Sequence, residues 1–185
     1  ASDVYKRQGM TQETAIQSAL RGLKKSPIPG NLILCCMRGS SNQQENMETL
    51  DLARRYLTED GGVVAVDLAG AEALFPTESY KNLFAKAKEY NVPFTIHAGE
   101  CHSTENVRTS IEMGAKRIGH GIAMKEDPEL MKLAAERDVG IEMCPCSNFQ
   151  AKAVQEGEEY PLALFWEQGL LVTVNTDNRL SLIHI

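Results

Sequence analysis

The segment PFTIHAGECHSTENVRTSIEMGAKRIGHG, residues 93–121, holds one complete repeat of the pattern that decides the fold. A short apolar run ends at His97, an amphipathic segment follows, and a second apolar run ends at His120. Apolar runs without polar alternation are typical of strands that are buried on both faces of a parallel sheet. The segment therefore predicts a strand, a helix and a second strand parallel to the first.

The same alternation extends outward over most of the chain. Apolar runs occur at Leu32–Met37, Val63–Asp67, Pro93–His97, Arg117–His120, Gly140–Cys144 and Leu171–Asp177. They follow one another at intervals of roughly 30 residues, which is the length of a βαβ unit. Thr11 and Asp127 are expected to cap helices that begin directly after them. Gly61, Gly114 and Gly169 are expected at the C-termini of helices.

Strict β/α alternation leaves two main architectures, an open doubly wound sheet and a (β/α)8 barrel. The doubly wound reading requires a glycine-rich phosphate loop after a strand, and neither G-x-G-x-x-G nor G-x-x-x-x-G-K-[ST] occurs in the chain. A barrel places its chemistry at the carboxyl ends of several strands. Polar residues stand at or just past the predicted strand ends: Arg38, Asp67, His97 with Glu100, His120, Asn148 and Asp177. The prediction is an α/β fold, an incomplete TIM (β/α)8 barrel with about six of its eight βα units.

The composition argues against several classes of protein. The chain of 185 residues is 43% hydrophobic and 24% charged, which is ordinary for a globular domain. It has no run of about 18 apolar residues for a membrane span. A net charge of −6 without a basic block argues against nucleic-acid binding. Five unevenly spaced cysteines and no secretory signal predict reduced thiols in a cytoplasmic protein.

His97 and Glu100 form the first candidate site. A histidine at a strand end presents its imidazole at the mouth of a barrel, where the neutral nitrogen can bind zinc. Gly99 lets the chain bend, so that the carboxylate of Glu100 faces the same space. A packed histidine followed by a capping glutamate would give the same pattern, so this motif alone leaves both interpretations open.

His120 and Asp177 extend the candidate site. His120 ends the next strand between two glycines, and adjacent parallel strands end at the same edge, so both histidines are expected in one pocket. Asp177 supplies a carboxylate after the last run, although its neighbours are also good turn residues. Together these residues offer metal ligands and proton-transfer groups. Cys144 and Cys146 have no second chelating pair and are interpreted as buried thiols.

With these residues placed, the chain resembles the adenosine deaminase family, particularly its bacterial members. Six motifs from about Gly9 to Leu180 stand in the family's order and spacing, and in register they are highly specific. They are Cys35-Cys36-Met37-Arg38, Asp67-Leu68-Ala69-Gly70, His97-Ala98-Gly99-Glu100, Arg117-Ile118-Gly119-His120-Gly121, Cys144-Pro145-Cys146-Ser147-Asn148 and Asn175-Thr176-Asp177.

The resemblance implies zinc-dependent hydrolysis of the 6-amino group of adenosine or deoxyadenosine, which gives inosine or its deoxy form and ammonia. By position, His97 and Asp177 would be zinc ligands. Glu100 would protonate purine N1 while hydroxide attacks C6, and His120 would orient or deprotonate the attacking water. The partner implied is a small purine nucleoside, with one zinc ion per active site.

Two further residues would bind the substrate if the resemblance holds. Gly70 would donate its backbone N–H to the purine ring. Asn178 stands where many family members carry a second aspartate that bonds N7. Zinc deaminases with an H-x-E and C-x-x-C signature are a different design, because this chain has H-x-x-E and C-x-C.

The chain also departs from the family pattern. The family's first strand carries an H-x-H pair that completes the metal site, and no H-x-H occurs here. We therefore expect two further histidine ligands in a missing N-terminal segment. Residues 9–180 are expected to form a partial TIM-barrel deaminase domain, with unrelated ends at 1–8 and 181–185, and to be inactive alone. An adenine deaminase of the same barrel family and a catalytically inactive barrel fragment remain as alternatives.

Overall fold

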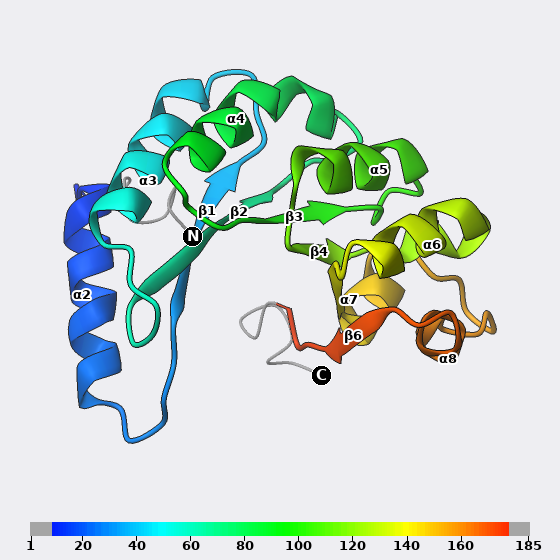
Figure 1. The fold of residues 1–185 in the computed structure, drawn as a ribbon. Coiled ribbons are helices and arrows are strands. Elements are labelled where there is room, and N and C mark those ends of the chain that lie inside the picture. Colours follow the sequence, from blue (N-terminus) through cyan, green and yellow to red (C-terminus); the bar gives the residue numbers. More distant parts are fainter. Residues whose placement is uncertain (1–8, 178–185) are drawn as a thin grey trace. The chain divides into compact units, whose positions relative to one another are not determined.

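The computed structural model describes residues 9–177. The chain divides into two compact units. The first unit runs to Ala69 and includes Asn82–Phe94, and the second contains Gly70–Lys81 and the residues from Thr95 onward. Strands and helices alternate along the sequence in both units (Figure 1).

The first unit contains a two-stranded parallel sheet covered by helices. Its elements are α2 (Gln12–Lys25), β1 (Leu32–Met37), α3 (Gln43–Arg55), β2 (Val63–Ala69) and α4 (Lys81–Glu89), of which α4 contributes all but its first residue. Helix α3 packs against both strands. Leu50, Val66 and Phe84 are completely buried in its core. The ring of Phe84 lies 4.6 Å from that of Phe94, centroid to centroid.

The second unit contains a four-stranded parallel sheet with the strand order β3-β4-β5-β6. Each strand thus pairs with the next one in the sequence, as in a (β/α)8 barrel. The elements are η1 (Thr77–Tyr80), β3 (Thr95–Ala98), α5 (Thr104–Met113), β4 (Arg117–His120), η2 (Ile122–Glu126), α6 (Pro128–Glu136), β5 (Gly140–Met143), α7 (Pro145–Gln150), α8 (Leu162–Glu167) and β6 (Leu171–Val174).

Each apolar run of the sequence contains a strand, and every named strand pair is parallel, so the predicted α/β architecture is confirmed. Some strand ends differ from the prediction. β2 continues past Asp67 because its last residue still pairs with Met37 of β1, and Asp67 is therefore a buried residue inside the strand. β6 stops at Val174, so that Asp177 lies in the loop beyond it.

The predicted helix caps are confirmed except at one glycine. The side chains of Thr11 and Asp127 accept hydrogen bonds from the backbone N–H groups of the first turns of α2 and α6. Gly114 ends α5 with φ 93°, and Gly169 follows the last turn of α8 with φ 79°. Gly61 does not end α3: the helix stops at Arg55, because the chain after it turns to pair with Val63.

Within residues 9–177, no helix combines the length and the apolar character needed to cross a lipid bilayer.

Candidate active site

The ends of β3 and β4 place two histidines side by side. His97 is the third residue of β3 and pairs with Gly119, and Ala98 pairs with His120, the last residue of β4. The two imidazole rings have centroids 5.1 Å apart and an interplanar angle of 62°. A Cβ atom at Gly119 would stand 3.2 Å from the His97 ring, so glycine at this position leaves room for that ring.

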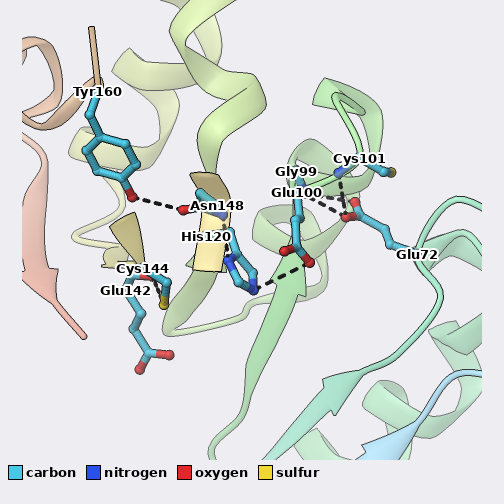
Figure 2. A network of polar contacts seen from close by, with 9 residues as sticks. All are labelled: Glu72, Gly99, Glu100, Cys101, His120, Glu142, Cys144, Asn148 and Tyr160. Atoms are coloured by element: carbon cyan, nitrogen blue, oxygen red, sulfur yellow. Dashed lines mark hydrogen bonds and ion pairs between the residues drawn. The ribbon is translucent and has the colours of Figure 1, made fainter. Parts of the chain in front are cut away.

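Hydrogen bonds fix the orientation of the His120 ring. Its side chain is only 2% exposed, and its Nδ1 lies 3.0 Å from the amide nitrogen of Asn148. The amide oxygen of Asn148 accepts a hydrogen bond of 2.9 Å from the hydroxyl of Tyr160 (Figure 2). An amide nitrogen can only donate, so Nδ1 is an acceptor and the neutral ring carries its proton on Nε2. This Nε2 lies 3.7 Å from a carboxylate oxygen of Glu100.

Two features of His120 set it apart from an ordinary surface histidine. Burial lowers its pKa below the usual value of 6.5, and the nearby carboxylate of Glu100 opposes this effect only in part. The imidazole is therefore neutral at pH 7. Its backbone also has φ 67°, in the left-handed region that non-glycine residues rarely adopt. Such strain is characteristic of functional sites, where the surrounding structure holds it in place.

The turn after β3 carries Glu100. Gly99 has φ 81°, and a Cβ atom there would stand 2.7 Å from a methyl group of Val107, so the turn requires glycine. The backbone N–H groups of residues 99–101 all donate to the carboxylate of Glu72, over 2.7, 3.1 and 3.3 Å (Figure 2). The Glu100 side chain remains about one third exposed and faces His120.

A cluster of possible metal ligands lies beside these residues. One donor atom each from His120, Cys144 and Asp177 lie within 4.8 Å of one another. Imidazole nitrogen, carboxylate oxygen and cysteine sulfur are the donors that zinc prefers. Asp177 is exposed and has φ 55°, whereas Cys144 is buried. Burial raises the pKa of the Cys144 thiol to about 12, and the charge of Asp177 adds to this rise.

The structure thus brings together some of the predicted site residues. His97 and Glu100 both lie next to His120, and Asp177 approaches His120 from the loop after β6. Gly70, the first residue of the second unit, is exposed and has φ 110°. Asn178 lies outside the described residues.

Sequence reasoning missed the roles of Glu72, Cys144 and Tyr160. Glu72 is the one charged residue between Asp67 and Glu78, and a lone carboxylate in an apolar loop was a usable signal. Cys144 was interpreted as a buried thiol, which it is, whereas the same interpretation of Cys146 was wrong, because Cys146 is exposed. The position of Cys144 beside Asp177 depends on the loop after β6. The bond from Tyr160 to Asn148 joins the segment before α8 to helix α7, and no sequence spacing indicates it.

Comparison with known proteins identifies the family. A family model described as adenosine deaminase matches residues 4–182 of the chain. The chain belongs to the adenosine deaminase family. An adenosine deaminase of Haemophilus ducreyi is 46% identical over 184 residues, which cover 96% of this chain and 54% of that protein. An adenosine deaminase of Enterococcus faecalis is 40% identical, with 97% and 53% covered. This adenosine deaminase family chain therefore spans about half the length of these relatives.

Solved structures of related proteins support the fold. The adenine deaminase of Arthrobacter aurescens superposes with a TM-score of 0.81 at 25% identity, over 95% of this chain and 54% of that one. A zinc-containing amidohydrolase of Burkholderia ambifaria gives 0.74 at 22% identity, over 90% and 45%. An Arabidopsis N6-mAMP deaminase gives 0.78 at 22% identity, over 92% and 53%. These likenesses and the parallel sheets confirm that this family member has the predicted partial barrel fold.

Proposed function

We propose that the protein containing this chain is a hydrolase that converts adenosine or deoxyadenosine to inosine or deoxyinosine and releases ammonia. Family membership and the names of the relatives support this reaction. The observation that carries it is the pair of His120 and Glu100. A buried neutral imidazole lies 3.7 Å from a solvent-accessible carboxyl group at the ends of neighbouring strands. This pair offers a group to orient water and a proton donor for the purine ring.

Glu100 is proposed as the group that protonates purine N1. Addition of hydroxide at C6 breaks the aromatic ring system, and a proton on N1 accepts the electron density that this addition moves into the ring. The carboxyl group of Glu100 is held on a turn whose three successive backbone N–H groups are bonded to Glu72. Such a fixed geometry is what a proton donor in a transition state requires.

His120 is proposed to orient the attacking water. Its Nδ1 accepts from Asn148, so its Nε2 carries a proton and can donate to a water oxygen. A ring in this form has no free lone pair on Nε2 with which to take a proton from the water. The hydrogen bond therefore favours orientation over deprotonation, two roles that the sequence alone left open.

The chain's donor groups fit a zinc ion. His97 at the end of β3 and Asp177 after β6 are proposed as its ligands, with His120 and the neutral Cys144 thiol beside them. Two further histidines outside this chain are proposed to complete the ligand set, because catalytic zinc usually has at least three protein ligands. When bound, zinc supplies hydroxide at neutral pH by lowering the pKa of a water molecule to about 7.

The substrate is proposed to be a purine nucleoside in the cytoplasm. Gly70 would donate its backbone N–H to the purine, and Asn178 would contact N7. Arabidopsis relatives of the same fold were solved as complexes with IMP and GMP, which supports a purine as the ligand. The five free cysteines support a reducing compartment. Free adenine is the second candidate substrate, favoured by the TM-score of 0.81 with an adenine deaminase.

Ammonia release by the full-length, zinc-loaded protein tests the proposal. Adenosine, deoxyadenosine and adenine are each supplied as sole substrate, with a chelator-treated sample as control. We expect release from both nucleosides, little from adenine, and loss of activity on removal of the metal. A clear preference for adenine would replace the nucleoside assignment with the second candidate. Absence of ammonia from all three substrates would overturn the proposed function.

A further inference from the structure

Glu72 is a buried acidic residue that takes no direct part in the proposed reaction. Only 7% of it is exposed, in the loop after β2. Its carboxylate accepts hydrogen bonds from the backbone N–H groups of Gly99, Glu100 and Cys101. A fourth bond, of 2.9 Å, comes from the side-chain amide of Asn106. Four donors thus converge on one side chain, and the three that belong to the turn carrying Glu100 are drawn in Figure 2.

Burial of the Glu72 carboxylate lowers the stability of the fold unless hydrogen-bond donors compensate for it. A carboxylate that leaves water loses hydration energy, and it is retained in a fold only where donors satisfy its oxygens. Three consecutive backbone N–H groups that point at one anion form a nest, which defines the path of the backbone. Since one of these N–H groups is that of Glu100 itself, the carboxylate of Glu72 fixes the backbone atoms from which the Glu100 side chain extends.

Asn106 connects the same carboxylate to helix α5. Its amide nitrogen donates to Glu72, and its amide oxygen accepts a bond of 3.0 Å from the backbone N–H of Thr77. The backbone N–H of Asn106 donates to Ser103, the N-cap of α5. The carboxylate of Glu72 therefore connects the turn that follows β3 to the first turn of α5.

We propose that Glu72 is a positioning residue, which holds the turn at residues 99–101 so that the carboxyl group of Glu100 stays beside His120 and in reach of the purine ring. This inference rests on the proposed function. Glu72 acts through Glu100, because its carboxylate oxygens are occupied by the four N–H donors. A displacement of the reacting carboxyl group by about 1 Å can lower the rate of the reaction about 100-fold.

The substitution Glu72→Gln in the full-length, zinc-loaded enzyme tests the inference. Glutamine keeps the size of the side chain but turns an amide NH2 group toward backbone donors. We expect kcat for adenosine to fall about 10- to 100-fold, with KM changed less than about threefold. Glu78→Gln is the matched control, because Glu78 lies in the same unit, has a side chain 59% exposed and pairs only with Lys81 among the ion pairs described. It should leave both constants unchanged.

A double-mutant cycle separates positioning from a general effect on the fold. If Glu72 acts through Glu100, Glu72→Gln lowers kcat strongly in the natural enzyme but less than about twofold in a Glu100→Gln background. Equal losses in both backgrounds, or a rate equal to that of Glu78→Gln, would overturn the inference. Should Glu72→Gln not fold, Glu72→Asp keeps the charge on a shorter side chain, and the same cycle applies to it. An unsubstituted enzyme that released no ammonia would instead mean that the proposed function itself is wrong.

Discussion

At the scale of single residues, the site depends on the His120 side chain and on the neighbouring atom that determines which of its ring nitrogens carries the proton. The amide nitrogen of Asn148 can only donate a hydrogen bond, so Nδ1 of His120 accepts it. The other ring nitrogen, Nε2, faces Glu100. The pair is thus built from a neutral ring and a carboxyl group in reach of water. Each member is expected to contribute to the chemical step in a different way, and substitutions can distinguish the two contributions.

Replacement of Glu100 by glutamine is expected to remove the proton donor and to retain the zinc. Loss of a positioned acid costs about 10²–10⁴-fold in rate, so kcat for adenosine should fall within that range. Metal content, measured by atomic absorption, should stay at that of the natural enzyme, because Glu100 is not a proposed ligand. Glu112→Gln serves as control, since Glu112 is an exposed residue of α5. Full activity of the Glu100 variant would exclude its assigned role.

Replacement of His120 by alanine should act on turnover more than on binding. Orientation of water matters chiefly in the transition state, so kcat should fall far more than KM rises. Steady-state kinetics with adenosine measure both constants. A raised KM at unchanged kcat would show that His120 binds the substrate and has no part in water activation.

Residues differ in how far the sequence alone reveals them. His97, Glu100 and His120 could be found because strand ends are visible as breaks in apolar runs, and barrels use strand ends for chemistry. For Glu72 the sequence shows only a lone carboxylate in an apolar loop and not its partners, because these are mainly backbone N–H groups, which every residue type except proline possesses. Only the folded turn brings these groups together.

At the scale of elements, the apolar runs predicted which segments form strands, and most cap residues predicted where helices begin or end. The exact ends of the strands were predicted less well. Asp127 followed by proline predicted the start of α6, because this pair satisfies a free N–H and presets the first helical residue. The predicted end of β2 at Asp67 was wrong, because pairing with β1 extends the strand to Ala69. The prediction that Gly61 ends a helix was wrong, because the segment after α3 pairs with Val63. The local sequence pattern does not indicate this pairing.

Two glycine-to-alanine substitutions should change stability in opposite directions. Gly22 lies inside α2, where a Cβ atom would have no neighbour within 4 Å, so alanine should raise the free energy of unfolding by about 0.5–1 kcal/mol. Gly99 has φ 81° and a methyl group 2.7 Å from the new Cβ, so alanine there should lower it by about 1–3 kcal/mol. Urea unfolding of the full-length protein measures both. A stabilised Gly99 variant would contradict this account of the turn.

At the scale of the whole molecule, the described residues contain six strands in two sheets, within a chain that spans about half the length of its relatives. The barrel fold buries strands on both faces and pairs every edge. In residues 9–177, however, β6 pairs only with β5. Large apolar side chains on and before β6 are exposed: Trp166 to 72%, Leu171 to 57% and Val174 to 64%. Such surface is more typical of an interface than of a monomer's exterior.

We therefore expect the 185-residue chain, expressed by itself, to be inactive and poorly folded. Its proposed zinc ligands are His97 and Asp177, fewer than the three that catalytic zinc usually has, so metal binding would add little to the free energy of folding. Unpaired strand edges and exposed apolar side chains favour aggregation. The purified chain with added zinc should show a broad thermal transition in near-UV circular dichroism and no ammonia from adenosine, with the full-length protein as control. A sharp cooperative transition together with ammonia release would show that these residues suffice for folding and catalysis.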